Sequence, residues 1–339
     1  MTDRVAYLEH TGAVVLGGVA ERFGGADAVA GELRALTAGA GLTDLSSEAR
    51  FDVAGADAPD FLHRLLTANV KHLAPGAGSH AFLLTGTGRI VLPLLVLRAN
   101  EARYELCAPA ALQAVLLAEL DRYLFSERVE ISPMGALRAL MSVQGPEAGA
   151  VVARAGLSPP EAPLAHAEGH LAGLPVRVLR HDRFDAPGYD VFVPASDFEA
   201  AWGALVGAGA RPSGRLAAEM ARVLAGACAW GHEWTPETSP TETSGLLGIT
   251  EGKGCYPGQE VIERTLALGA PPRALIRLQA EGALVPGDPV LAAGAEIGHV
   301  TSAATLPDGR HLGLALVKRK FAETAEPLRA GSVPARRRA

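Results

Sequence analysis

The sequence predicts an α+β fold in which two units of mixed strands and amphipathic helices precede a small C-terminal β-barrel. Three observations carry this prediction. Between residues 50 and 224, apolar residues recur with a period of two in some segments and with a helical period in others. After residue 270 the helical period ends, and short strand-like runs alternate with Gly, Pro and Asp turns. With 339 residues, 48% of them hydrophobic, the chain has enough apolar material for several cores.

The first unit is predicted to span residues 1–135. Asp57 and Pro59 suit the start of a helix. Pro93 implies a bulge or an edge in its strand, because proline donates no ladder hydrogen bond. The expected elements are strands at 50–53, 81–85, 89–98 and 104–108, and helices with apolar stripes at Phe61, Leu62, Leu65 and Leu66 and at Leu112, Val115, Leu116 and Leu120.

The second unit is predicted over residues 136–250, and the motif loop and barrel over 251–325. The segment from Thr235 to Ser244 is rich in Thr, Pro, Glu and Ser and indicates an exposed linker, while residues 326–339 indicate a flexible tail. The expected strands are 139–143, 175–180, 189–193, 274–278, 289–291, 297–301 and 312–317, and the expected helices pass through Val151 and Val152, through Phe198, Trp202 and Leu205, and over 215–224.

Composition excludes several classes of protein. A formal net charge of −6 argues against a broad surface for nucleic acid and leaves only a local basic cleft open. The three cysteines, Cys107, Cys228 and Cys255, are too few and scattered for a disulfide framework or for a metal or cluster site of their own. No segment approaches the ~20 apolar residues of a membrane span, and the first residues lack a signal-peptide pattern. A cytoplasmic protein that binds neither membrane nor nucleic acid is therefore expected. We also expect it to be a monomer.

The octapeptide Lys-Gly-Cys-Tyr-Pro-Gly-Gln-Glu at 253–260 is the most informative segment for function. Lys253 can favour the thiolate of Cys255, the form that attacks electrophiles or binds a soft metal. Free cysteines are often small buried hydrophobes, but a core cysteine needs neither the lysine nor the two glycines that let the backbone turn. The predicted site contains Lys253 and Cys255 as the reactive pair, with Gly254, Tyr256, Gly258, Gln259, Glu260 and Arg264 around them.

This octapeptide matches the KGCYxGQE motif of the folate-binding YgfZ family, a relative of the glycine-cleavage T-protein, which is an aminomethyltransferase. Further stretches that resemble the family, in order, are Gly41-Leu-Thr-Asp-Leu-Ser, Phe61-Leu-His-Arg-Leu-Leu-Thr-Ala-Asn-Val, Val143-Gln-Gly-Pro, Gly188-Tyr-Asp-Val-Phe-Val-Pro and Gly231-His-Glu. The resemblance implies a GcvT-like ring of two ferredoxin-like α+β domains plus a C-terminal β-barrel, with a central cavity for a folate.

The resemblance also implies which residues bind the cofactor, tetrahydrofolate or a derivative. Asp190, beside Tyr189, matches the carboxylate that accepts two parallel N–H bonds from the pterin, although it is one methylene shorter than the usual glutamate. Arg222 matches an arginine near the glutamyl end of the folate, with an ion pair to Glu219 on the same helix as the alternative. His80 stands where a tyrosine is common, and either contacts the ligand or lies in a surface turn.

One departure bears on the reaction. The aminomethyltransferases carry an aspartate pair, one member of which acts in proton chemistry, and the chain has Leu92 and Pro93 there instead, neither of which can hold a proton. The resemblance therefore implies a tetrahydrofolate-binding accessory protein for iron–sulfur cluster assembly or repair. Its partners would be iron–sulfur enzymes or cluster-assembly proteins, with indirect effects on tRNA modification.

The alternatives are a folate-dependent aminomethyltransferase and a non-catalytic scaffold that docks a partner through the Lys253 loop. Cys255 as nucleophile, redox thiol or cluster-contacting group stays open, because one thiolate can do each but cannot complete a cluster's ligand set. The folate as carbon acceptor, reductant or ordering ligand stays open as well.

Overall fold

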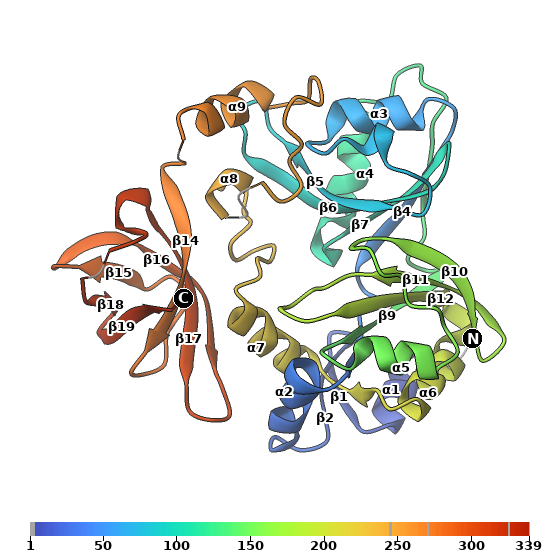
Figure 1. The fold of residues 1–339 in the computed structure, drawn as a ribbon, viewed down its shortest axis with the longest axis horizontal. Helices are drawn as coiled ribbons and strands as arrows, with labels where there is room; N and C mark the ends of the chain where they lie inside the picture. Colours follow the sequence, from blue (N-terminus) through green and yellow to red (C-terminus); the bar gives the residue numbers. More distant parts are fainter. Residues whose placement is uncertain (1–3, 244–245, 270, 325, 339) are drawn as a thin grey trace. The chain divides into compact units, whose positions relative to one another are not determined.

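The computed structural model describes residues 4–243, 246–269, 271–324 and 326–338 (Figure 1). It contains two compact units. The first comprises Met1–Phe61, Val70–Ser79 and Leu95–Ala221, and the second Leu62–Asn69, His80–Leu94 and Arg222–Ala339. Helices α3 and α7 and strands β5 and β6 begin in one unit and end in the other. The predicted domain boundaries at residues 135 and 250 remain predictions.

A six-stranded sheet in the order β10-β11-β12-β9-β3-β13 forms one layer of the first unit. Met141 and Val143 of β9, Val191 of β12 and Trp202 of α6 belong to one buried cluster that joins this sheet to its helices. The elements are α1 (Arg4–His10), β1 (Ala13–Leu16), β2 (Val19–Phe23), α2 (Ala28–Ala38), β3 (Gly41–Asp44), β9 (Arg138–Gln144), α5 (Ala148–Arg154), β10 (His166–Leu171), β11 (Leu174–Arg180), β12 (Gly188–Pro194), α6 (Phe198–Gly207), β13 (Arg211–Pro212) and α7 (Arg215–Ala225).

A five-stranded sheet has the order β5-β6-β7-β4-β8. Leu95, Leu97 and Cys107 of this sheet share a buried cluster with Leu140 and Phe192 of the six-stranded sheet, so the two sheets pack face to face there. The elements are β4 (Ala49–Ala54), α3 (Ala58–Leu65), β5 (Gly78–Leu84), β6 (Ile90–Asn100), β7 (Arg103–Ala108), α4 (Gln113–Arg122) and β8 (Glu130–Pro133).

The predicted strands before the barrel are confirmed to within three residues at each end. Pro93 precedes the residues of β6 that pair with β7, which run from Leu95 to Asn100, so the ladder begins where proline no longer interrupts it. The sequence did not indicate the elements before residue 49. Helix α2 buries Glu32, whose carboxylate accepts hydrogen bonds from the backbone amides of Phe23 and Gly214, and this buried charge interrupts the apolar stripe.

The second unit contains the predicted β-barrel, which closes in the order β14-β17-β16-β15-β18-β19. The prediction of a flexible tail at 326–339 was wrong, because β18 and β19 are barrel strands. Pairs from Arg277↔Arg338 to Ala280↔Ala335 join β19 to β14, which leaves no unpaired edge in the barrel. The strands are β14 (Arg273–Ala280), β15 (Pro289–Ala292), β16 (Ala295–Thr305), β17 (His311–Lys318), β18 (Leu328–Ala330) and β19 (Val333–Arg338), and the helices are α8 (Pro240–Thr243) and α9 (Gln259–Ala267).

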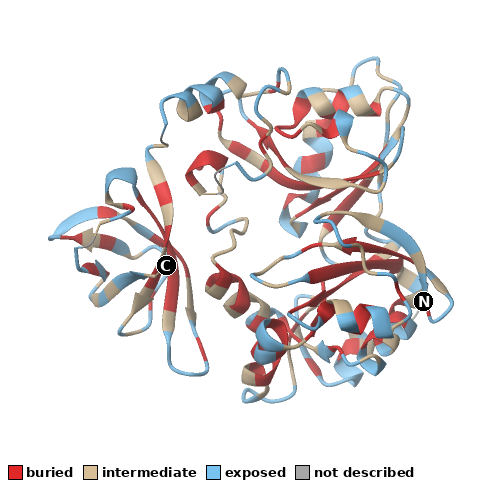
Figure 2. Ribbon diagram, viewed as in Figure 1, coloured by how far each residue is buried: buried red, intermediate tan, exposed pale blue. Residues whose placement is uncertain are grey.

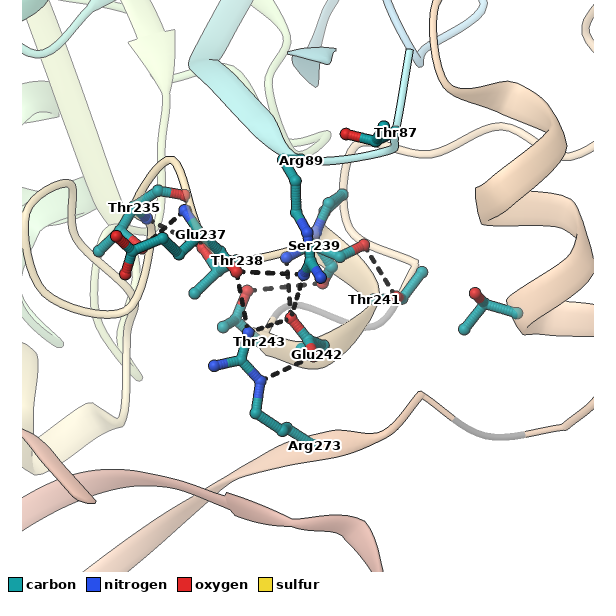
Figure 3. A network of polar contacts seen from close by, with 12 residues as sticks. Thr87, Arg89, Thr235, Glu237, Thr238, Ser239, Thr241, Glu242, Thr243 and Arg273 are labelled. Atoms are coloured by element: carbon teal, nitrogen blue, oxygen red, sulfur yellow. Dashed lines mark hydrogen bonds and ion pairs between the residues drawn. The ribbon is translucent and has the colours of Figure 1, made fainter. Parts of the chain in front are cut away.

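The predicted exposed linker from Thr235 is an ordered, partly buried segment as far as it is described, and its last predicted residue, Ser244, lies outside the described residues. Figure 3 shows Arg89 and Arg273 converging on the carboxylate of Glu242 in α8. Arg273 donates two hydrogen bonds of 2.8 Å to Glu242, and the backbone amide of Ser239 donates a third of 2.9 Å. The composition of this segment predicted that it would be exposed. The segment can be buried because Arg89 and Arg273, distant in the sequence, form ion pairs with the buried Glu242 carboxylate.

Burial is concentrated in the strands and in the inner faces of the helices (Figure 2). Among the described residues, none of the helices combines the length and apolar character that a bilayer crossing requires.

Candidate functional site

The Lys253 loop leads into α9 through two glycines with left-handed backbone angles. Gly254 has a φ of 108° and Gly258, which precedes the helix, a φ of 78°. A Cβ on Gly258 would lie 2.5 Å from the carbonyl oxygen of Thr85 and 2.9 Å from the Cα of Gly88. Glycine is therefore needed at 258 both for its backbone angle and because the loop touches the turn between β5 and β6.

Lys253 and His63 tie this loop to α3 by two reciprocal contacts. The His63 Nε2 donates to the Lys253 carbonyl oxygen at 2.9 Å, and the Lys253 ammonium donates to the His63 carbonyl oxygen. The Lys253 Nζ also lies 5.0 Å from the centre of the Tyr256 ring. His63 falls inside a stretch that resembles the YgfZ family, but its place beside the loop depends on contacts 190 residues apart.

Burial shifts the pKa values of Lys253 and Tyr256 in this loop. It lowers the pKa of Lys253 to about 8, and the nearby Cys255 acts in the opposite direction. Burial also raises the pKa of Tyr256 to about 12, with a further contribution from Glu263. Tyr256 belongs to a buried cluster with Phe82, whereas Cys255 is exposed. The loop is thus anchored by its lysine and tyrosine, and it presents its thiol to solvent near an amine whose pKa is lowered to about 8.

The remaining motif residues point along α9. Gln259 donates to Glu263 at 2.6 Å, and Arg264 donates to Glu260 at 2.6 Å. These are i,i+4 contacts of an exposed helix face, and each stabilises it by about 0.2–0.5 kcal/mol. In this structure their hydrogen bonds therefore stabilise the helix that follows the loop.

Asp190 lies elsewhere, at the centre of a buried polar network in the first unit. Its two carboxylate oxygens accept hydrogen bonds from Ser142 Oγ at 2.7 Å, from His181 Nδ1 at 2.9 Å and from Arg183 Nη2 at 2.7 Å. Burial alone would raise the pKa of Asp190, but Arg183 and His181 outweigh burial and hold it well below its usual range. Arg183 also bonds Glu48 at 3.0 Å, so it bridges two carboxylates.

Sequence reasoning missed the partners of Asp190. Ser142 is the cross-strand neighbour of Asp190 in the β9–β12 register, and His181 follows directly after β11. Strand alternation places Ser142 and Asp190 on one face, so the strand pairing, once known, gives this contact. The reach of Arg183 to Glu48, 135 residues away, has no local signal.

The other predicted ligand contacts are engaged as well. Arg222 pairs with the fully buried Glu233 at 2.9 Å and donates to Ser302 at 2.7 Å. The Tyr189 hydroxyl accepts from Arg180 at 2.9 Å, with the Arg180 guanidinium 5.2 Å from its ring. His80 is half-buried on β5. The structure thus gives Arg222 the partner Glu233 from the loop after α7.

Residues 10–249 match the GCVT N-terminal domain family. The chain belongs to this family. An aminomethyltransferase of Streptomyces avermitilis is 32% identical over 294 residues, which cover 82% of this chain and 78% of that protein. A putative chloroplastic transferase of Arabidopsis thaliana is 26% identical over 93% of this chain and 73% of its own length.

The solved structure of glycine cleavage system aminomethyltransferase T from Bartonella henselae has the same fold. It matches with a TM-score of 0.86 and 23% identity, over 97% of this chain and 94% of that one. The predicted GcvT-like fold is therefore confirmed. Since the similar proteins are named aminomethyltransferases, the comparisons support the transferase better than the iron–sulfur accessory protein.

The resemblance sets Leu92 and Pro93 against the aspartate pair of the aminomethyltransferases. Both residues are buried on β6, and Leu92 has no exposed surface. Neither side chain can donate or accept a proton. Proton transfer at this point of the strand therefore cannot come from these two residues.

Asp190, Arg222 and Tyr189, three of the residues predicted to bind folate, already have side-chain partners in this conformation. Asp190 is fully buried, and Ser142, His181 and Arg183 already supply donors to both of its oxygens. A pterin edge could reach this carboxylate only after Arg183 moved away. The predicted direct contact therefore does not fit the arrangement described, and we derive no reaction step through a folate.

Proposed function

We propose that this protein binds a reduced folate, tetrahydrofolate or a derivative, and that its reactive group is the Cys255 thiol. Membership of the GCVT family supports the folate. The observation that carries the second part is the Lys253 loop, in which a locked lysine and a buried tyrosine flank an exposed cysteine. Such a thiol beside an amine of lowered pKa suits attack on an electrophile or reversible oxidation.

In its finer form, the proposal is an accessory role toward iron–sulfur enzymes or cluster-assembly proteins, with indirect effects on tRNA modification. It rests on the KGCYxGQE motif at Lys253–Glu260 and on the loss of both acids at Leu92 and Pro93. Within the described residues, no group of three or more His, Cys, Asp or Glu is placed to hold a metal. Cys255 would therefore share a cluster with its partner or act on it by redox chemistry. A cytoplasmic monomer remains part of this proposal.

Aminomethyl transfer is the second candidate function, and the similarity to named aminomethyltransferases favours it. The buried Leu92 and Pro93 weigh against it, because an alternative group would have to move the proton. A scaffold that docks a partner through the Lys253 loop without folate is the third.

One set of measurements separates the three functions. Calorimetric titration with tetrahydrofolate should show saturable binding, and ligand identification by mass spectrometry should find a folate in the purified protein. Absence of both would leave only the scaffold. A transfer assay with an aminomethylated lipoyl donor should give no product, and product formed at the rate of a known aminomethyltransferase would establish the second candidate instead.

The role of Cys255 is tested by the Cys255→Ala variant in cells that lack the native protein. We expect folding and folate affinity to persist and complementation to fail. Cys228→Ala is the matched control, because Cys228 is half-buried and its Sγ lies 3.6 Å from the Thr243 carbonyl oxygen. Full complementation by Cys255→Ala would remove the thiol from the mechanism.

The role of Asp190 is tested with two variants, one of Asp190 and one of its ion-pair partner Arg183. If Asp190 binds the pterin after Arg183 withdraws, Asp190→Asn should weaken tetrahydrofolate binding by about 1–3 kcal/mol, the cost of a mismatched polar contact. Arg183→Met should strengthen binding, since it removes the competing cation. Unchanged affinity in both variants, with native circular dichroism, would rule out the contact.

A further inference from the structure

A polar cavity of about 310 Å³ lies in the first unit and includes none of the residues discussed above as folate or thiol groups. Its charged lining residues are three acids and three arginines: Asp52, Glu105, Glu168, Arg103, Arg138 and Arg177. Three acids and three arginines leave its formal charge at zero. A cavity of this size is at the lower end of the range of small-molecule sites.

Strand register brings these charges together. Arg103 and Glu105 are two positions apart on β7 and therefore lie on one face of the sheet. The register with β4 places Asp52 directly opposite Glu105. In the other sheet, Glu168 of β10 lies opposite Arg177 of β11. The pair between Arg177 Nη1 and Glu105 Oε2, 2.7 Å apart, joins the two sheets at the cavity.

The six groups are unequally satisfied. Arg177 bonds both Glu105 and Glu168, the latter at 2.8 Å, and is almost fully buried. Arg103 donates its Nε to Asp52 at 2.7 Å, and half of its side chain is exposed. Arg138 reaches Glu105 only at 3.7 Å, beyond hydrogen-bond distance, with 31% of its side chain exposed. Arg138 thus offers a guanidinium fork to whatever enters the cavity.

Glu105, in contrast to Arg138, has an oxygen that lacks a hydrogen-bond donor within the described part of the chain. Its side chain is only 5% exposed, and among the residues that the structure describes its Oε1 has no hydrogen-bond donor. A buried charged oxygen without a donor is costly, and such an atom indicates a partner that the protein itself does not provide. An N–H cation would meet this need.

We propose that this cavity binds a small zwitterion of the α-amino-acid class. Its ammonium would donate to Glu105 Oε1, and its carboxylate would accept from Arg138, with Arg103 at the exposed rim. A simple anion would leave Glu105 Oε1 without a donor, and a simple cation would leave Arg138 without a hydrogen-bonded acid. A zwitterion places both charges correctly and leaves the neutral lining balanced. This inference is independent of the proposed folate function.

The test is calorimetry on the full-length chain with each standard L-α-amino acid in turn, up to about 50 mM, a range that detects millimolar affinity. For the tightest binder, its N-acetyl derivative and its α-amide are the matched probes, since each keeps the side chain and removes one charge. We expect saturable binding of the amino acid, and at least about tenfold weaker binding of both derivatives.

Two variants locate the site. Arg138→Gln should weaken binding at least about tenfold, because a neutral amide replaces the guanidinium. Arg128→Gln, at an exposed arginine that pairs with Asp57 elsewhere in the same unit, should leave binding unchanged. Glu105→Gln should also abolish binding, and circular dichroism checks that it folds.

Three results would overturn the inference: no saturable binding of any amino acid, equal binding of the N-acetyl derivative, or unchanged binding in Arg138→Gln. The first shows that the cavity takes no standard amino acid, the second that it is an anion site, and the third that binding occurs elsewhere. The Arg138 and probe results decide the matter even if Glu105→Gln fails to fold.

Discussion

Replacing Gly258 with alanine tests the placement of the Lys253 loop directly. The φ of 78° at Gly258 is a left-handed angle, which costs an alanine about 1–2 kcal/mol. The added Cβ would also lie 2.5 Å from the Thr85 carbonyl oxygen and 2.9 Å from Gly88, both backbone atoms that cannot rotate away. Overpacking of this kind costs about 1–3 kcal/mol. The total expected loss of unfolding free energy is therefore about 2–5 kcal/mol.

Gly252→Ala is the matched control. Its φ of 68° carries the same backbone cost, but nothing lies within 4 Å of an added Cβ. It should lose only about 1–2 kcal/mol, so the difference between the two variants isolates the contact with the turn between β5 and β6.

The assay is urea denaturation followed by tryptophan fluorescence, because Trp230 and Trp234 pack against the cluster that contains Tyr256. The rate at which iodoacetamide alkylates Cys255 should rise in Gly258→Ala and not in Gly252→Ala, since only the former displaces the loop. Equal losses of unfolding free energy in the two variants would refute the close approach of Gly258 to Thr85.

Three further predictions concern buried charges. Burial lowers the pKa of His166 to about 4, so the unfolding free energy should fall as the pH drops from about 6.5 toward 4. The His166→Gln variant should lose less unfolding free energy over that pH range. Parallel curves of unfolding free energy against pH for the two proteins would contradict this. Acylation of Lys253, followed by mass spectrometry, should rise with a midpoint near pH 8, and a midpoint near that of an ordinary lysine would exclude the burial effect. Glu242→Gln should cost about 2–3 kcal/mol of unfolding free energy, because Arg89 and Arg273 lose their carboxylate, and a loss below about 0.5 kcal/mol would show that the pairs are not coupled to folding.

The sequence by itself determined the layered α+β architecture and the barrel, and it predicts the octapeptide as a candidate site. These rest on short-range physics: the period of apolar side chains, the turn residues between strands, and glycines at positions where a Cβ is excluded. The absence of an acid at Leu92 and Pro93 is likewise a property of residue type alone.

Only the tertiary structure decided where the charges find their partners. Arg222 pairs with Glu233, Asp190 with His181 and Arg183, and the C-terminal strand with β14. A buried charge or a strand edge must be satisfied by some partner, but local periodicity does not say which one. The same reason explains why the ordered segment around Glu242 and the cavity at Glu105 emerge only from the folded chain: each is assembled from strands and loops far apart in the sequence.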